Sequence, residues 1–252
     1  MTEDISTLIS SRLRSDEELV PKNPDSRRQT IGVVLPSSNR TVERVAHAFL
    51  QSRPRVDVCV ARVPYGGHPA SGYDLESFRC AAALLRDARP DVVLWNATRG
   101  ALLGFDPDRT LCAMLEDMLG VPATTTSLAT LETLRAAGSR RIGLIAQGDR
   151  NECDKLIDAF GKEGVTVVDS SALGISDNFE AAAVTANELE EVAFRICRDS
   201  TPDCIIIWST NLGGYSLSMG QTRLSTPILD SATIGFTAAF SFLDGQKTGA
   251  DA

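Results

Sequence analysis

Short apolar runs alternate with amphipathic stretches along most of the chain, from Ile31 onward. Runs such as IGVVLP and DVVLWN are bounded by turn residues, which is typical of buried β-strands. Strands separated by helices predict parallel pairing through right-handed crossovers. The pattern therefore predicts an α/β fold, with strands expected over 31–36, 56–64, 91–96, 120–126, 140–149, 165–169, 203–209 and 226–230.

Between these runs, apolar residues recur at helical spacing; Val42, Val45 and Phe49, for example, share one face of a helix. Asp74 is placed to open the second helix, and Thr126 or Ser127 to cap the fourth. The expected helices cover 41–52, 74–88, 108–119, 128–138, 151–164, 186–200, 215–224 and 232–243.

The two halves of the chain repeat each other. RRQTIGVVLPSSNR aligns with GSRRIGLIAQGDRN, and RPDVVLWNATRGALLG aligns with TPDCIIIWSTNLGGYS. A looser match joins LGVPATTTSLATL to LSTPILDSATIGF, and all three keep their order at separations of 105 to 112 positions. Such a repeat indicates a duplicated structural unit. We therefore expect two pseudo-symmetric lobes, each a parallel sheet flanked by helices, with the site in the cleft between them.

The expected domain boundaries follow from the repeat. Residues 30–126 form the first lobe, residues 127–230 form the second, and residues 231–245 return to complete the first. Residues 1–29 are polar and mixed in composition, and we interpret them as an N-terminal arm outside the core. The alternative role for this arm is a contact within an oligomer.

Composition and charge narrow the classes of function. The hydrophobic content of 43% is enough for a sizeable core, and the net charge of −8 argues against nucleic acid or an anionic membrane as a partner. Apolar runs fall well short of the roughly 20 residues of a membrane span. The N-terminal residues lack the pattern of a secretory signal, so we expect a cytoplasmic protein.

The cysteines and histidines do not predict a metal site. No two of the six cysteines are spaced as C-x-x-C, and His47 and His68 share no ligand spacing with each other or with a cysteine. Reduced, structural thiols are the simplest interpretation for a cytoplasmic protein. We expect no metal.

The repeat also predicts where a ligand binds. Ligands of parallel sheets bind beyond the carboxyl ends of the strands, where loops and helix N-termini present free N–H groups. The matched turns there are PSSNR with AQGDR, and NATRG with STNLG, and they are rich in Ser, Thr, Asn and Gly. Such turns suit an anion such as a carboxylate.

These turns resemble the aspartate/glutamate racemase superfamily and, within it, the maleate isomerase and arylmalonate decarboxylase branch. IGVVLPSSNRTVE is similar to the opening strand and turn of that branch, and GVPATTTSLATLETLRAAGSRRIGLIA to its central segment; the match extends from Ile31 to Phe240. The resemblance implies chemistry without a cofactor on a small carboxylate compound, carried out by one or two cysteines at strand tips. A cleft of N–H donors suits a thiol because it stabilises the thiolate.

The chain departs from the branch at both cysteine positions. The first falls on Ala97, and the second on Thr210, or on Ser209 or Asn211 if the alignment slips by one residue. Among the cysteines, Cys153, four residues past Asp149, is the nearest candidate, but its spacing matches neither position. We therefore expect chemistry that does not use a thiol.

The resemblance assigns substrate binding to Asn39 and Thr98. Asn39 matches a substrate-orienting asparagine in the first turn, with an Asx-type helix cap as the alternative. Ser38 is expected either to bind a carboxylate or to cap. Arg99 suits a bidentate pair with a carboxylate, with a solvated loop position as the alternative. Asn96, at the end of its strand, is expected to line the pocket.

Two residues are candidates for proton transfer. Thr210 is the hydroxyl nearest to a cysteine position, but a threonine needs an adjacent base to act as an acid or a nucleophile, so a hydrogen-bond donor is its alternative role. Asn211 is expected to bind substrate beside it. His68 lies in a glycine-rich loop. This loop is either a mobile lid that carries His68 to the site or a plain surface loop. The branch's tyrosine after the central strand is replaced by Gln147 or Gly148.

We predict an isomerase or decarboxylase-like lyase that acts on a small carboxylate compound by acid–base chemistry, without a thiol or a cofactor. Asp149 and Asp230 are conceivable bases. One alternative is a non-catalytic or regulatory protein that binds small carboxylates, and another is a hydrolase or dehydratase on the same fold. A homo-oligomer is expected from the resemblance, with neither nucleic acid nor a membrane as partner.

Overall fold

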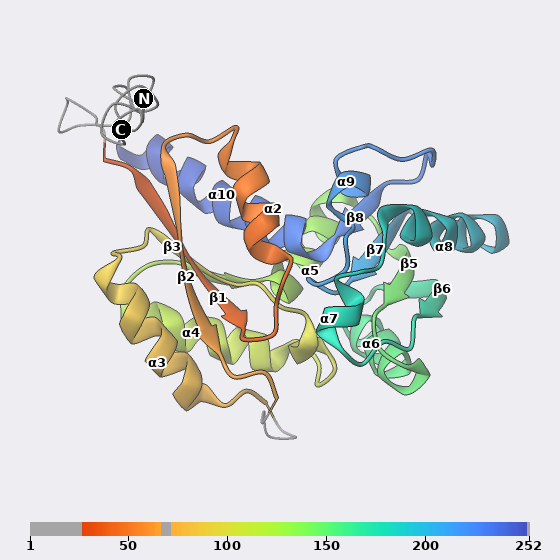
Figure 1. Ribbon diagram of the computed structural model, residues 1–252, viewed down its shortest axis with the longest axis horizontal. Coiled ribbons are helices and arrows are strands. Elements are labelled where there is room, and N and C mark those ends of the chain that lie inside the picture. The colour runs from red at the N-terminus through yellow and green to blue at the C-terminus, as the bar shows by residue number, and fades with distance from the viewer. Residues whose placement is uncertain (1–26, 67–71, 251–252) are drawn as a thin grey trace, which may run out of the picture.

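The computed structural model describes residues 27–66 and 72–250. Two four-stranded parallel sheets lie side by side, in the orders β2-β1-β3-β4 and β6-β5-β7-β8, so both lobes share one topology (Figure 1). The predicted α/β fold with two parallel sheets is confirmed. The strands are β1 (Gln29–Pro36), β2 (Val56–Val63), β3 (Val92–Trp95), β4 (Ala123–Thr125), β5 (Arg141–Ala146), β6 (Thr166–Ala172), β7 (Cys204–Trp208) and β8 (Ile228–Asp230).

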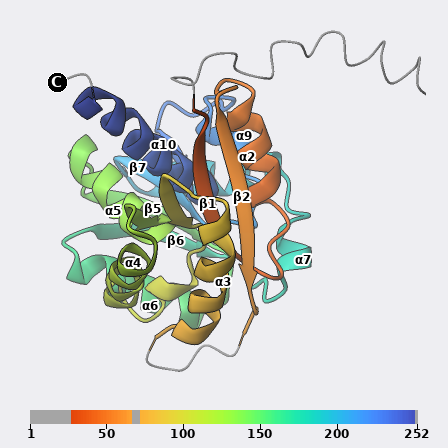
Figure 2. The ribbon, with the colours of Figure 1, turned by 90° about the vertical axis from the view of Figure 1, so that its left-hand side faces the viewer.

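Helices pack on both faces of each sheet (Figure 2). Because side chains alternate along a strand, Ile31 and Val33 of β1 pack with α2 and α10, whereas Val34 packs with α3 and α4. The helices are α2 (Val42–Leu50), α3 (Leu75–Asp87), the 3-10 helix η1 (Arg99–Ala101), α4 (Asp106–Leu119), α5 (Thr126–Ala137), α6 (Arg150–Lys162), α7 (Asn178–Ala181), α8 (Ala186–Asp199), α9 (Tyr215–Ser218) and α10 (Ser231–Ala250).

The repeat extends to single hydrogen bonds at the amino ends of the sheets. The carboxylate of Asp91 accepts from the backbone N–H of Thr30 at 2.8 Å, and that of Asp203 accepts from the N–H of Arg141 at 2.9 Å. The N–H groups of Arg141 and Arg140 lower the pKa of the Asp203 carboxyl below its ordinary value. The aligned aspartates thus stabilise equivalent strand starts in the two lobes.

The last helix crosses from the second lobe to the first. α10 follows β8 directly, yet its apolar residues Phe236 and Phe240 pack in one cluster with Ile31 of β1 and Leu94 of β3. Figure 1 shows α10 running from beside β8 along the first sheet. The chain therefore passes between the lobes twice, at α5 and at α10.

Some boundaries differ from those predicted. α9 ends at Ser218 rather than near 224, and Gly220 follows with a positive φ of 85° that no longer belongs to a helix. The cap of α5 is Thr125, not Thr126 or Ser127, because Thr125 is still extended and its hydroxyl accepts from the N–H of Leu128. α7 was not predicted. β1 begins at Gln29, inside the expected arm.

The expected arm, apart from residues 27–29, lies outside the described residues, and so does His68. Of the helices in the described ranges, none combines the length and hydrophobicity that crossing a membrane requires.

Candidate active site

A cavity of about 460 Å³ lies between the lobes, at the carboxyl ends of their strands. Its lining includes Pro36 at the end of β1, Trp95 at the end of β3 and Trp208 at the end of β7. Gln147, which follows β5, lines it as well. This volume is typical of a pocket for a small organic ligand. The cavity therefore occupies the place that the repeat predicts for a site.

Four of the predicted site residues line the cavity. Thr98 and Arg99 come from the turn after β3, and Thr210 and Asn211 come from the turn after β7. Ala97, at the first cysteine position of the resemblance, lines it too. The aligned turns of the two halves thus face one cavity from different lobes.

Arg99 brings a positive charge to this cavity. The residue is exposed, and the centre of its guanidinium lies 6.0 Å from the centre of the Tyr65 ring. Within the described ranges, Arg99 forms no ion pair with a carboxylate. A planar guanidinium without a partner can bind a carboxylate through two parallel hydrogen bonds.

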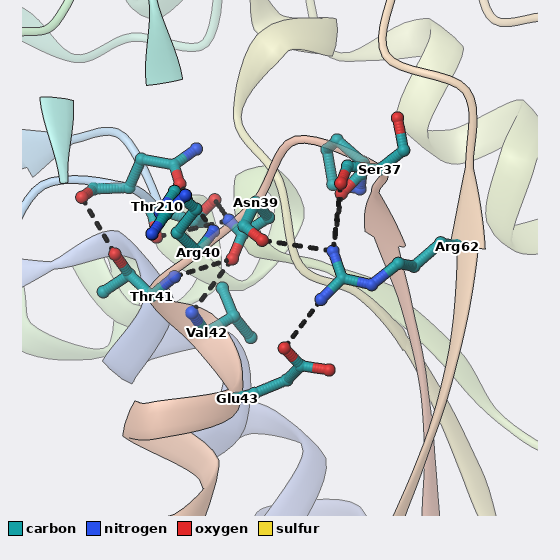
Figure 3. A network of polar contacts seen from close by, with 10 residues as sticks. Ser37, Asn39, Arg40, Thr41, Val42, Glu43, Arg62 and Thr210 are labelled. Carbon is teal, nitrogen blue, oxygen red and sulfur yellow. Dashed lines mark hydrogen bonds and ion pairs between the residues drawn. The ribbon is translucent and has the colours of Figure 1, made fainter. Parts of the chain in front are cut away.

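Asn39 links the lobes beside the cavity (Figure 3). Its Nδ2 donates to the hydroxyl oxygen of Thr210 at 3.1 Å, while its Oδ1 accepts from the N–H groups of Thr41 and Val42 at 3.1 and 3.0 Å. One side chain thus makes both the predicted helix-capping contact and a contact with the site. Because Thr210 already accepts from Asn39, its hydroxyl hydrogen is available to a ligand. Asn39 is itself buried and is not among the lining residues.

The same turn also holds Asn211. The N–H of Arg40 donates to Oδ1 of Asn211 at 3.0 Å, and the hydroxyl of Thr41 donates to the Asn211 carbonyl at 3.0 Å. The guanidinium of Arg40 lies over the ring of Phe179 on α7, 4.6 Å from its centre. The start of α2 is therefore connected to two segments of the second lobe.

Arg62, on β2 of the first lobe, stabilises the turn that contains Asn39 (Figure 3). Its guanidinium donates to the carbonyl oxygens of Pro36, Ser37 and Asn39 at 3.2, 3.3 and 3.1 Å, and to the Glu43 carboxylate at 2.6 Å. Contacts with several carbonyls at once suit the rigid fork of arginine better than the compact ammonium of lysine. No sequence pattern singled out this residue, because an arginine on a strand is ordinarily a surface residue.

A chain of oriented hydrogen bonds follows the wall formed by the second lobe. Ser209 donates its hydroxyl to Oε1 of Gln147, whose Nε2 donates to Oδ1 of Asn178 at 3.0 Å. Asn178 then donates through Nδ2 to the hydroxyl oxygen of Ser38 at 2.7 Å. Since Ser38 accepts here, its hydroxyl hydrogen is free for another acceptor. Ser38 is not a lining residue itself but is bonded to one, Asn178.

Asn96 is not among the lining residues. Its side chain is fully buried, its Nδ2 donates to the carbonyl of Ala232 at 3.2 Å, and its Oδ1 accepts from the hydroxyl of Thr126 at 3.1 Å. These contacts join the end of β3 to the first residues of α5 and α10. The end of a strand predicted exposure to the pocket, but two helix starts cover this position.

A buried polar network supports the first-lobe wall. Trp95 Nε1 donates to the hydroxyl of Tyr73 at 3.1 Å, and Tyr73 donates to Oδ2 of Asp108 at 3.2 Å. Burial raises the pKa of Asp108 to about 6, and the hydroxyls of Thr125, Tyr73 and Ser127 offset this only in part. Oδ1 of Asp108 completes no hydrogen bond among the described residues. We infer that the hydroxyl groups of Thr125 and Ser127 point toward the carboxyl group but form no hydrogen bond with its Oδ1 atom.

The two aspartates considered as bases have different surroundings. Asp149 lines the cavity, but its carboxylate caps α6 by accepting from the N–H of Glu152 at 2.9 Å. Asp230 is buried away from the lining and accepts from the N–H and the hydroxyl of Thr233 at 2.9 and 2.8 Å. Burial raises the pKa of Asp230 to about 6. Glu152, which the sequence did not single out, also lines the cavity.

All six cysteines lie within the described residues, and none lines the cavity. Cys153 is fully buried on α6, in a cluster with Phe160. Burial raises the pKa of Cys112 to about 12 and that of Cys204 to about 11, so both are protonated thiols at neutral pH. Across the described ranges, no group of three or more His, Cys, Asp or Glu side chains could hold a metal ion.

Replacing Asn39 with alanine is expected to lower the free energy of unfolding by about 2 kcal/mol, because the change removes a buried cap and the bond to Thr210. Asn39→Asp is the matched variant, since it keeps the acceptor for the N–H groups of Thr41 and Val42 but loses the Nδ2 donor. Urea unfolding of both variants separates the two contributions. An alanine variant as stable as the unaltered protein would show that this contact adds no net stability.

Comparison with known proteins points to one family. A family model described as arylmalonate decarboxylase matches residues 72–251. The maleate isomerase of Nocardia farcinica is 26% identical over 226 residues, covering 85% of this chain and 90% of that protein. The maleate isomerase of Alcaligenes faecalis is 24% identical over 218 residues, covering 80% and 86%.

Solved structures show the same fold. The structure of the maleate isomerase Iso of Pseudomonas putida S16 with maleate has a TM-score of 0.75 at 26% identity and covers 86% of this chain and 92% of its own. Unliganded arylmalonate decarboxylase has a TM-score of 0.71 at 23% identity, covering 85% and 92%. The family model spans well over half of the sequence. The chain therefore belongs to the arylmalonate decarboxylase family.

Proposed function

We propose that this protein is an enzyme that isomerises or decarboxylates a small carboxylate compound, without a cofactor and without a catalytic thiol. The observation that supports this most strongly is the make-up of the cavity. Arg99 and the donors Thr98 and Thr210 lie at one site, whereas the cysteines lie elsewhere. The relatives are named for maleate and arylmalonate, compounds that each carry two carboxylates.

In the proposed reaction, Arg99 anchors one substrate carboxylate through a bidentate pair. Thr210, oriented by Asn39, donates its hydroxyl hydrogen to the substrate from the opposite lobe. Decarboxylation places negative charge on the carbon next to the remaining carboxylate, and so does isomerisation by removal and return of a proton at that carbon. Donors that are fixed before the reaction stabilise that charge without reorganising, which lowers the barrier.

Arg99→Ala is expected to weaken the binding of maleate and phenylmalonate by about 10- to 100-fold, because a charge-assisted bidentate contact is lost. Isothermal titration calorimetry measures the change. Arg79→Ala serves as the control, since Arg79 is exposed on α3, with only a long contact of 3.6 Å to Glu76, and is not a lining residue. Equal affinities for the Arg99 variant and the unaltered protein would rule out this anchor.

The proposed activity is tested by incubating the protein with maleate, fumarate and phenylmalonate and following each compound by proton NMR. Turnover of at least one compound, reduced in Thr210→Val, is the expected result. Tight binding of these compounds with no turnover would contradict the enzyme and favour the second candidate, a protein that binds small carboxylates. That candidate rests on the position of the cysteines, since none lies at the cavity.

A further inference from the structure

Glu152 has an unusual position for the third residue of a helix. It follows the cap residue Asp149 at the start of α6, where a glutamate ordinarily reaches back to the N–H of the cap residue. Glu188 does this at the equivalent position of α8, where its carboxylate accepts from the N–H of Thr185 at 2.8 Å. Glu152 makes only the other half of the motif, through its own N–H. Its carboxylate is therefore not held at the N–H of the cap residue and can point in another direction.

The carboxylate of Glu152 lies over Gly148. A Cβ atom placed on Gly148 would be 1.8 Å from Oε2 of Glu152, so the glutamate occupies the space of a side chain at that position. Gly148 and Glu152 both line the cavity, as does Leu156, one helical turn further along α6. This face of α6 is thus directed to the cavity, with Glu152 on it.

The carboxylate of Glu152 also has no competing partner. Within the described ranges it accepts no hydrogen bond and forms no ion pair, although the side chain is partly buried. Asp149, the other acidic residue of the lining, is occupied as the cap of α6. Among the described residues, the Thr210 hydroxyl is hydrogen-bonded to the amide of Asn39 and not to a carboxylate or histidine that could serve as its base. Glu152 is therefore the group in the lining best suited to take up a proton.

We propose that Glu152 exchanges a proton with the substrate carbon next to the carboxylate bound by Arg99, an assignment that rests on the proposed function. The C–H bond breaks as the O–H bond of Glu152 forms. The electron pair remains on the substrate and is delocalised into its anchored carboxylate. The neutral acid then returns a proton to the carbon and regenerates the carboxylate. The Glu152 carboxylate thus has the role that the resemblance assigns to a cysteine thiol in the maleate isomerase and arylmalonate decarboxylase branch.

The first experiment compares Glu152→Gln with the unaltered protein in deuterium oxide. Proton NMR measures the exchange of the C–H hydrogen of phenylmalonate and of succinate, and calorimetry measures their binding. The variant is expected to lose exchange by at least about 100-fold. Its binding of both dianions is expected to be equal or severalfold tighter, because a negative charge has left the cavity. Misfolding would not tighten binding.

Two further variants test whether exchange depends on the position of the Glu152 carboxylate, rather than on the loss of a negative charge or of stability. Gly148→Ala keeps the glutamate but fills its place, so exchange should fall by at least about 10-fold while the protein stays folded. Glu188→Gln removes a helix-capping glutamate on α8 and should leave exchange unchanged.

The outcomes distinguish this role from the proposed function. If the unaltered protein exchanges the proton and Glu152→Gln exchanges it at a similar rate, the role of Glu152 is wrong and the proposed function stands. If the unaltered protein binds the probes but neither converts them nor exchanges a proton, the proposed function is wrong and this role fails with it.

Discussion

Between pH 4 and pH 7, the free energy of unfolding of the unaltered protein is expected to fall by about 2.4 kcal/mol relative to that of Asp108→Asn. Burial of the carboxyl raises its pKa from 3.8 to about 6 in the folded protein. The folded chain therefore holds this proton through a pH range in which the unfolded chain releases it. Stability falls as pH rises through that range and changes no further above it.

The variant escapes this loss because an amide does not ionise. Its oxygen can accept from Tyr73 in place of Oδ2, and its NH2 group can donate to the hydroxyl of Ser127, which completes no hydrogen bond among the described residues. Asp230→Asn is expected to show the same sign, because burial raises the pKa of Asp230 to about 6 as well.

Urea unfolding at intervals of half a pH unit measures these differences. Asp199→Asn is the control of opposite sign, because the side chain of Arg198 lowers the pKa of the exposed Asp199 carboxyl. That group stabilises the fold above its unfolded pKa, and its effect is lost as pH falls. A pH-independent difference for Asp108→Asn would show that the carboxyl is not held protonated in the folded protein.

Gly100→Ala is expected to lower the free energy of unfolding by about 3 kcal/mol. A Cβ at this position would lie 1.8 Å from the hydroxyl oxygen of Tyr73 and 2.5 Å from Oδ2 of Asp108. Both groups are buried, and the Tyr73 ring is confined by Phe78 and Trp95, so neither can move aside easily. The new methyl group must therefore displace η1 or break the bond between Tyr73 and Asp108.

Displacement of η1 would also move Arg99, its first residue, so the affinity for maleate should fall with the stability. Gly161→Ala on α6 is the matched control, because no atom other than its chain neighbours and the adjacent backbone of α6 lies within 4 Å of the added Cβ. That change should stabilise the protein by up to about 1 kcal/mol through helix propensity. An unchanged unfolding midpoint for Gly100→Ala would mean that η1 and Tyr73 are less closely packed than this geometry requires.

Much of the fold was predictable because its signals are local. Apolar runs marked the strands of both sheets, and the alignment of Asp91 with Asp203 located equivalent strand starts that make the same backbone hydrogen bond. Prediction failed at short elements. α7 and α9 have four residues each, too few for an apolar stripe to be recognised. The cap of α5 shifted by one or two residues in a run of similar hydroxyl side chains.

The candidate site was predictable only where the repeat pointed to it. Thr98 and Thr210 stand at aligned strand ends, so their convergence on one cavity followed from topology. Asn178 and Arg62 had no such signal. Asn178 belongs to a short unpredicted helix, and Arg62 acts through carbonyl oxygens, which are the same for every residue type. Asn96 stands at a strand end, yet the starts of α5 and α10 cover it.

The sequence by itself determined the two-lobed α/β fold and the positions of the turns that meet at the cavity, because strand periodicity and internal repetition are properties of order along the chain. Only the tertiary structure decided what each side chain does there. Thr210 is oriented by Asn39 from the other lobe, and the raised pKa of Asp108 depends on burial in contact with Tyr73. Those are consequences of neighbours distant in the sequence, which no local pattern encodes.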